Sequence, residues 1–167
     1  FVRWYFKQVY SFADVLIAIS PMVEEAIREL GVTTRVVRMA NPLQINKWKR
    51  TEALRKKGRE ILGLKDGEFC VMDVGQLQAR KGPEDFIDIA GKLPHIQFRW
   101  IGGRPFGAIT EGVKRLNAKI DNAPPNVKFA GLFSLEEMPA LYAAADAFVF
   151  LSYQENSPLA PVEAAAS

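Results

Sequence analysis

The sequence predicts an α/β protein built on a doubly wound parallel sheet, as in a Rossmann fold. Short apolar runs rich in Val, Ile and Phe alternate with longer amphipathic segments, and this alternation repeats along most of the chain. Glycine or proline stands at many of the boundaries. Strands that follow one another through helices lie parallel, with the helices on both faces of the sheet. We therefore expect a parallel sheet whose ligands bind beyond the carboxyl ends of its strands.

Residues 1–40 are predicted to form a separate β-α-β piece. Ser20 is a candidate N-cap, Pro21 suits the first helical position, and Gly31 is a stop signal. The pair Asn41-Pro42 then breaks the pattern and marks a hinge. The expected elements are a strand at 14–20, a helix at 20–31 and a strand at 34–39.

A helix dense in basic residues is expected from Asn46 to about Leu62. Its basic residues are Lys47, Lys49, Arg50, Arg55, Lys56, Lys57 and Arg59. So many like charges usually mark a solvated helix face, and contact with phosphate or an anionic lipid surface is the alternative.

Four further strand–helix repeats follow. In the third of them, Ser134 and Glu137 have the spacing of a capping box. The expected strands are 70–75, 96–103, 127–131 and 147–152, and the expected helices are 83–93, 110–120, 134–145 and one that opens near Leu159.

The composition of the 167 residues is that of an ordinary globular protein, with 49% hydrophobic and 25% charged residues. A formal charge of +3 permits an anionic ligand, an acidic membrane surface or nucleic acid but selects none of them. The one cysteine, Cys70, lies in an apolar run and is expected in the core, which fits a reducing cytoplasm. No Cys/His cluster has metal-ligand spacing, and the one histidine, His95, is interpreted as incidental.

The first loop at the expected carboxyl edge reads "GQLQARKG". Gly75 and Gly82 would let the backbone approach a ligand closely, and Arg80 and Lys81 supply cations. A diphosphate fits this combination, because charge-assisted hydrogen bonds to phosphate are strong. An ordinary basic surface turn is the competing interpretation.

The second loop, "IGGRPFG", places Gly102 and Gly103 at the end of a strand, where a sugar or nucleotide could come near. No GxGxxG opens the following helix, so the conventional dinucleotide fingerprint is absent. A plain βα turn explains the glycines equally well. The third loop, "FAGLFS", offers backbone groups only.

The fourth loop carries two carboxylates. Glu155 precedes a helix that begins around Leu159, and Glu163 lies about one turn inside it. Pro158 and Pro161 are compatible with a first helical turn. The two acids could accept hydrogen bonds from different hydroxyls of one extended ligand, with a phosphate near the helix N-terminus between them. Alternatively, both acids simply favour the helix N-terminus.

Taken together, these motifs resemble the carboxyl-terminal half of family 4 retaining glycosyltransferases, which have the two-Rossmann-domain (GT-B) architecture. The stretches that carry the resemblance are "VVRMANPLQINKW", "VGQLQARKGPEDFIDIA", "IQFRWIGG" and "NVKFAGLFSLEEMPALYAAADAFVFLSYQENSPLAPVEAAA". Glu155 and Glu163 fill the Glu-x7-Glu signature of that family. More narrowly, "GQxQxRKG", "PFGAIT" and "YQENSP" resemble bacterial glucosyltransferases that act on diacylglycerol.

The resemblance implies a role for individual residues. Lys81 would bind the donor diphosphate and offset the charge that develops there as the sugar bond breaks. Glu155 would bind sugar hydroxyls, and Glu163 would hold the ribose hydroxyls. Backbone N–H groups from Ser157 to Leu159 would contact sugar or phosphate.

Lys81 and Glu155 are accordingly expected to act in catalysis. The expected donor-binding residues are Gly75, Gln76, Arg80, Lys81, Gly102, Gly103, Glu155, Asn156, Ser157, Pro158, Leu159 and Glu163. The resemblance implies no metal and no cofactor other than the nucleotide sugar, with UDP-glucose as the expected donor.

The chain departs from the family pattern at Gln76, where many members have an arginine, and Arg80 is a candidate replacement. The resemblance also implies a fold that is incomplete at both ends. Residues 1–40 would be the last β-α-β piece of an amino-terminal acceptor domain, and residues 41–167 the donor domain, truncated in its final helices. The rest of the acceptor domain would be the partner of this chain.

The leading hypothesis is therefore the donor half of a hexosyltransferase that acts in the cytoplasm, with possible peripheral contact with an anionic membrane, and that is inactive as this piece alone. A non-catalytic nucleotide-binding module of the same fold is the alternative. An epimerase or a phosphorylase-like enzyme ranks lower. Nucleic-acid binding through the basic helix would require steep salt dependence, and the acids at the sheet edge argue against it.

Overall fold

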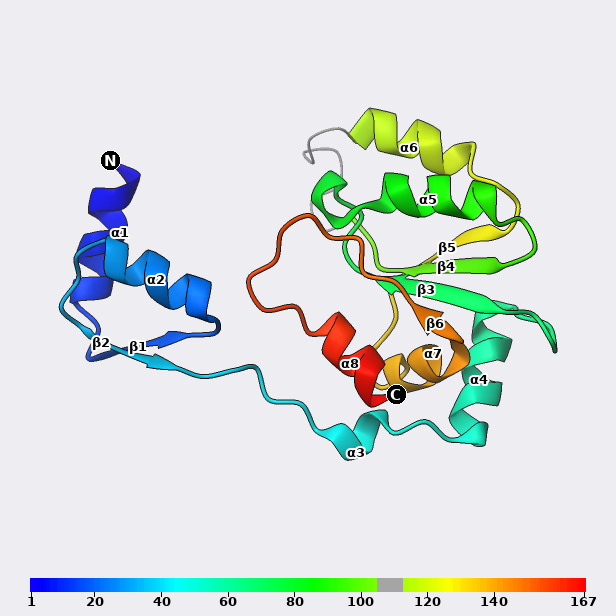
Figure 1. Cartoon of the computed structure of the whole chain (residues 1–167), viewed down its shortest axis with the longest axis horizontal. Helices are drawn as coiled ribbons and strands as arrows, with labels where there is room; N and C mark the ends of the chain where they lie inside the picture. Colours follow the sequence, from blue (N-terminus) through cyan, green and yellow to red (C-terminus); the bar gives the residue numbers. More distant parts are fainter. Residues whose placement is uncertain (105–112) are drawn as a thin grey trace. The chain divides into compact units, whose positions relative to one another are not determined.

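A computed structural model describes residues 1–104 and 113–167 of the chain (Figure 1). The described chain divides into two compact units. The first unit contains residues 1–43 together with 155–159, and the second contains residues 44–154 together with 160–167. Each unit is described by itself below.

The first unit has a β-α-β core preceded by a helix. Its elements are α1 (Val2–Ser11), β1 (Val15–Ala18), α2 (Pro21–Glu29) and β2 (Arg35–Arg38). The two strands pair in parallel, with Val15 opposite Arg35. The Ser20 hydroxyl accepts a hydrogen bond from the Val23 N–H at 3.2 Å, and Pro21 is the first residue of α2. The cap and the proline position predicted from the sequence are both confirmed.

The helix α1 carries an aromatic surface that the first unit leaves exposed. None of its residues is buried. The Trp4 side chain is 61% exposed, and Phe12, which follows the helix, is 87% exposed. The first unit therefore does not provide a core for these aromatic rings.

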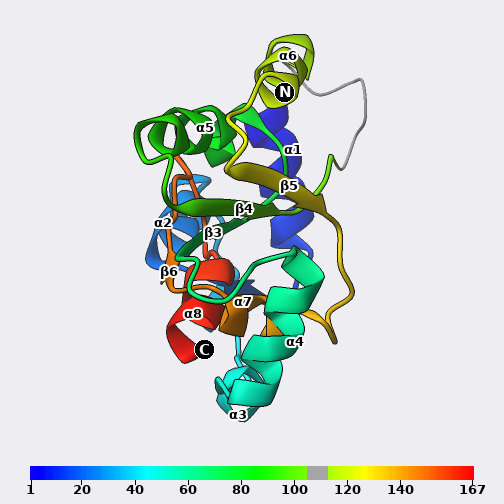
Figure 2. The same cartoon turned by 90° about the vertical axis from the view of Figure 1, so that its right-hand side faces the viewer.

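The second unit contains a parallel sheet of four strands in the order β5-β4-β3-β6 (Figures 1 and 2). All three pairings are parallel, which confirms the predicted fold class. The strands are β3 (Cys70–Val74), β4 (Gln97–Ile101), β5 (Val127–Gly131) and β6 (Ala147–Phe148).

Helices cover both faces of this sheet. Figures 1 and 2 show α5 (Pro83–Lys92) and α6 (Val113–Asp121) on one face, and α4 (Glu52–Leu62), α7 (Met138–Ala144) and α8 (Ala160–Ala166) on the other. The ring of Phe86, which belongs to α5, packs edge-on against Phe98 and Trp100 of β4, at centroid distances of 5.2 and 5.3 Å. Residues 110–112 of the helix predicted at 110–120 lie outside the described residues.

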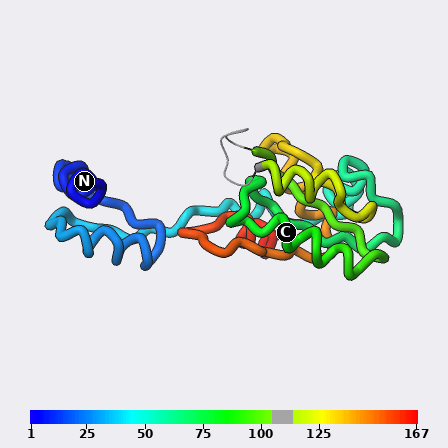
Figure 3. The backbone as a smooth tube through the Cα atoms, turned by 90° about the horizontal axis from the view of Figure 1, so that it is seen from above, coloured from blue at the N-terminus to red at the C-terminus, as the bar shows by residue number. Residues whose placement is uncertain are grey.

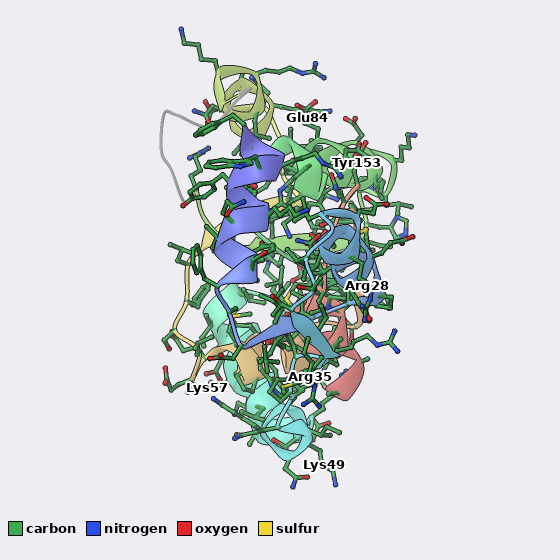
Figure 4. The ribbon with its side chains drawn as sticks, turned by 90° about the vertical axis from the view of Figure 1, so that its left-hand side faces the viewer. Arg28, Arg35, Lys49, Lys57, Glu84 and Tyr153 are labelled. Carbon is green, nitrogen blue, oxygen red and sulfur yellow. The ribbon has the colours of Figure 1, made fainter. Side chains whose placement is uncertain are left out.

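The basic segment forms two helices, α3 (Ile45–Trp48) and α4, so the prediction of one continuous helix from Asn46 is wrong. Thr51 between them has an extended backbone, and its hydroxyl accepts a hydrogen bond from the Leu54 N–H at 3.2 Å. Threonine thus starts a new helix as an N-cap. Trp48 is buried at the end of α3, whereas Lys49 and Lys57 project from the surface (Figure 4).

Two elements near the carboxyl end are shorter than predicted. The strand expected at 147–152 is regular only in β6, although the Val149 N–H still donates to the Met72 carbonyl at 2.9 Å. The helix expected from Ser134 begins at Met138. The Glu137 carboxylate accepts from both the N–H and the hydroxyl of Ser134, each at 2.9 Å, so only the Glu half of the expected capping box forms.

Cys70 is fully buried in β3, and burial raises the pKa of its thiol to about 11. It is a small core residue, as predicted from its apolar surroundings.

No helix in the described part of the chain is long and apolar enough to cross a membrane.

Candidate functional site

The loops after β3 and β4 meet at the carboxyl edge of the sheet. The Gly75 N–H donates to the Ile101 carbonyl at 2.9 Å, and the Leu77 N–H donates to the Gly103 carbonyl at 3.0 Å. The structure therefore brings together the first and second loops that the sequence analysis selected.

Gly102 has no room for a side chain. Its φ angle is +137°, and a β-carbon there would lie 2.0 Å from the Gly75 carbonyl oxygen. The Trp100 indole donates to the same oxygen at 2.9 Å. Glycine at 102 thus permits the close approach of the chain's own backbone, which is a structural requirement independent of any ligand.

Lys81 lies at this edge of the sheet. It ends a single 3₁₀ turn, Ala79–Lys81, that Gly82 terminates with a φ of +75°. A β-carbon at Gly75 would lie 3.7 Å from Lys81 Cδ, so the half-buried lysine stem runs past that glycine. The turn and the strand end therefore hold a long cationic side chain beside the Gly75 backbone.

Arg80 holds loop segments together. Its Nε donates to Gln78 Oε1 at 3.1 Å, and its Nη1 donates to the Gln154 carbonyl at 3.3 Å. Gln76 is exposed. The replacement of a diphosphate-binding arginine by Arg80 remains a prediction.

The start of the fourth loop is fixed against the Lys81 turn. A β-carbon at Gly82 would lie 2.5 Å from the Leu151 carbonyl oxygen, and the Tyr153 N–H donates to the Arg80 carbonyl at 2.9 Å. The Tyr153 hydroxyl donates to the Asp85 carboxylate, and this bond raises the pKa of the phenol. Tyr153 lies beside the start of α5, where Glu84 is also found (Figure 4).

Glu163 is held by a residue that the sequence analysis did not select. The Tyr142 hydroxyl donates to Glu163 Oε2 at 2.8 Å. Burial, followed by the hydrogen bond and the charge of Glu163, raises the pKa of Tyr142, so the phenol stays protonated at neutral pH. A tyrosine within "PALYAAA" was the available signal, because a buried phenol needs a polar partner.

The remaining predicted residues, Glu155, Asn156, Ser157, Pro158 and Leu159, belong to the first unit. There, the Asn41 amide donates to the carbonyl and the hydroxyl of Ser157 at 3.2 and 3.3 Å, and the 155–159 segment returns to the stretch around 41 (Figure 3). Glu155 and Glu163 lie in separately described units. A crevice shared by the two carboxylates therefore stays a prediction.

The histidine and the basic segment singled out in the sequence lie away from the carboxyl edge of the sheet. His95 is exposed just before the amino-terminal end of β4, whereas Lys81 and Gly102 follow the carboxyl ends of strands. Two arginines of the basic segment serve the fold, since Arg55 and Arg59 donate to main-chain carbonyls of α7. Among residues 1–104 and 113–167, no group of three His, Cys, Asp or Glu side chains could hold a metal ion.

Residues 55–167 match the protein family described as glycosyl transferases group 1. Among curated proteins, the chain is 38% identical to the alpha-galactosylglucosyldiacylglycerol synthase of Streptococcus pneumoniae strain R6 over 168 residues, which covers 98% of this chain and 44% of that protein. It is 26% identical to the processive diacylglycerol alpha-glucosyltransferase of Acholeplasma laidlawii, covering 96% of this chain and 48% of that protein. The chain thus spans less than half the length of these relatives.

Among solved structures, the chain is similar to Anabaena Alr3699/HepE in complex with UDP and glucose, with a TM-score of 0.82 and 26% sequence identity. This similarity covers 99% of this chain and 45% of that one. The predicted α/β architecture of a GT-B half is confirmed.

Proposed function

Because the chain belongs to the group 1 glycosyl transferases, we propose that it carries the donor-binding half of a retaining enzyme that moves a hexose from a nucleotide sugar to an acceptor. The observation that carries this proposal is the family match over residues 55–167. That stretch includes the loops that meet at Gly75 and Gly102, the cation Lys81 and the oriented carboxylate Glu163.

The proposed donor is UDP-glucose and the proposed acceptor is a diacylglycerol lipid. The HepE structure contains UDP and glucose, which supports the donor. Two of the curated relatives are named for diacylglycerol lipids, which supports the acceptor. Acceptor specificity would depend mainly on parts of the protein outside this chain.

In this proposal, the bond from the anomeric carbon of the sugar to the β-phosphate oxygen breaks, and its electron pair stays on that oxygen. The acceptor hydroxyl oxygen forms the new bond to the anomeric carbon, and the hydroxyl proton leaves with the released diphosphate. Lys81 stabilises the diphosphate charge that develops, which is electrostatic catalysis by a positioned cation. Glu155 holds the sugar hydroxyls, Glu163 holds the ribose hydroxyls, and the backbone from Ser157 to Leu159 contacts sugar or phosphate. The donor is a substrate, and the proposal invokes no metal and no further cofactor.

The domain assignment and the cellular site are part of the same proposal. Residues 1–40 would be the last β-α-β piece of an acceptor domain, and the rest of that domain would be the partner across the cleft. The protein would act in the cytoplasm. Exposed lysines such as Lys49 and Lys57 would favour peripheral contact with anionic lipid.

Calorimetric titration with UDP, UDP-glucose and ADP-glucose tests the donor assignment. Saturable binding of the uridine ligands is expected. Glu163→Ala should weaken it by about 10- to 100-fold, since a hydrogen bond to a charged group contributes about 1.5–3 kcal/mol. The matched control Glu60→Ala, an exposed acid of α4, should leave the affinity unchanged. Equal affinity for ADP-glucose, or no effect of Glu163→Ala, would contradict the assignment.

A non-catalytic nucleotide-binding module is the second candidate, favoured by Gln76 where many family members have an arginine. The two functions differ in sugar transfer by the full-length protein. Labelled glucose that moves from UDP-glucose to diacylglycerol in mixed vesicles would establish the enzyme. Binding of UDP-glucose without transfer to any lipid or sugar acceptor would favour the module.

A further inference from the structure

We propose that Tyr142 is a positioning residue for the donor site, because it holds the Glu163 carboxylate in the orientation that accepts the ribose hydroxyls. This inference rests on the proposed function, since it takes Glu163 as the ribose ligand. It adds a residue that lies outside the Glu-x7-Glu pair and does not itself touch the donor.

The geometry leaves one carboxylate oxygen available. The Tyr142 hydroxyl donates to Glu163 Oε2 at 2.8 Å, and Oε1 accepts no hydrogen bond within the described part of the chain. A carboxylate can accept several hydrogen bonds over its two oxygens. Glu163 is only half-buried, so ligand hydroxyls can reach it while Oε2 stays bonded to the phenol.

The phenol is held rigidly. Tyr142 is 4% exposed and belongs to α7, in which all seven residues are buried. Its ring stands edge-on to Trp48 of α3 at a centroid distance of 5.4 Å and contacts Phe148 of β6 at 5.8 Å. Three elements of the second unit therefore fix the donor atom that restrains Glu163.

Orientation of Glu163 matters because a glutamate side chain has several freely rotating bonds. Ordering such a side chain on ligand binding costs conformational entropy, and a bond that already orders it removes this cost. The hydroxyl also draws some negative charge from the carboxylate, which weakens the hydrogen bonds that the carboxylate can accept from the ligand. We expect ordering to dominate, because the second oxygen remains free to accept from the ligand.

The hydroxyl is not needed for the core itself. The neighbours of Tyr142 in α7 are apolar, and a phenylalanine would fill the same space without the cost of burying a hydroxyl. If packing alone explained the presence of a tyrosine at position 142, removal of its hydroxyl would not change the affinity for a ligand. A positioning role predicts an effect that depends on the ribose hydroxyls of the ligand.

The test measures the affinities of the full-length protein for UDP and for its 2′,3′-dideoxy analogue by calorimetry. The variants are Glu163→Ala, Tyr142→Phe and Trp48→Phe, each checked for folding by circular dichroism. The ratio of the two dissociation constants reports the contribution of the ribose hydroxyls. In the wild type, this ratio is expected to be about 10 to 100. Trp48→Phe keeps an aromatic ring beside the tyrosine, so the phenol stays in place with its hydroxyl while the packing around it changes slightly.

Tyr142→Phe should lower the ratio by about three- to tenfold, the cost of ordering one long side chain when the ligand binds. Trp48→Phe should leave the ratio unchanged, and Glu163→Ala should bring it near 1. In sugar transfer, Tyr142→Phe should raise KM for the donor and leave kcat unchanged.

A wild-type ratio in Tyr142→Phe, with the ratio lost in Glu163→Ala, would overturn the positioning role and leave the proposed function standing. A wild-type protein that does not bind UDP would overturn both.

Discussion

Gly102 lies where two strand ends come closer than any side chain allows. We expect Gly102→Ala to destabilise the second unit by about 2–4 kcal/mol, because the new β-carbon would collide with the Gly75 carbonyl in addition to adopting a strained φ. The matched control is Gly67→Ala, at φ +79° with open space around it, which should cost only about 1–2 kcal/mol. Urea unfolding followed by circular dichroism measures both. Equal losses would mean that the backbone approach relaxes easily.

Lys81 should act on phosphate and not on the nucleoside. Lys81→Ala is expected to weaken UDP binding by about 10- to 100-fold, as for a lost charge-assisted hydrogen bond, and to leave uridine binding unchanged. Lys92→Ala, an exposed lysine at the other end of α5, provides the control. Calorimetry with UDP and uridine distinguishes the outcomes. A parallel loss for both ligands would indicate that Lys81 supports the loop and not the diphosphate.

At the scale of elements, Asp146 connects α4 to the start of β6. Its carboxylate accepts from Arg55 at 2.7 Å and from the Cys70 N–H at 2.8 Å, and Arg59 lies 3.6 Å away. Burial alone would raise the pKa of Asp146, but the Cys70 N–H and the two guanidinium groups lower it below its ordinary value. The carboxylate is therefore stabilised in its charged form in the folded state.

Because the folded-state pKa is lowered, Asp146 stabilises the fold above its unfolded pKa of about 3.9. This stability is lost as the pH falls through the lower, folded-state value. We expect Asp146→Asn to cost about 1–3 kcal/mol at pH 7 and to flatten the loss of stability below about pH 4. Urea titrations at several pH values measure this. Asp88→Asn, in an exposed pair with Lys119, should cost less than about 1 kcal/mol.

The order and type of most elements could be predicted from the sequence, because strand runs and helix caps are local signals. Ser20 is such a cap, and the structure confirms it. The errors come from longer-range effects. The basic segment forms two helices because Trp48 is buried at the end of the first one and Thr51 caps the start of the second. The pattern of charges along the sequence indicates neither feature. The last regular strand ends at Phe148, and farther along Leu151 lies against Gly82, a contact that local signals do not encode.

The candidate site was predictable to a smaller extent. Lys81 and Gly102 follow from the rule that loops at the carboxyl edge bind ligands, and the structure places both at that edge. The partner of Glu163 could not be predicted, because Tyr142 lies 21 positions away and only the fold brings the two together. The hydrogen bonds from Arg80 to Gln78 and Gln154 could not be predicted either, because only the folded loops bring these residues together.

At the scale of the whole molecule, the first unit exposes more apolar surface than a parallel sheet normally does, since such sheets are usually covered on both faces. Exposed apolar side chains include Trp4, Tyr5, Phe12, Val15 and Ile17. We expect the 167-residue chain to self-associate as its concentration rises. Sedimentation velocity should show a rising mean mass, reduced by Trp4→Gln with Phe12→Gln and unchanged by Lys47→Ala. A constant monomer mass in the wild type would contradict this.

The hydrogen bonds from Asn41 to Ser157 also set an order of events during synthesis. These two residues of the first unit are 116 positions apart, so a ribosome making about 5–20 residues per second needs roughly 6 to 23 seconds to deliver the second one after the first. Throughout that interval, the first unit lacks its 155–159 segment. The early β-α-β piece can therefore complete its contacts with Ser157 only after nearly all of these residues have been translated.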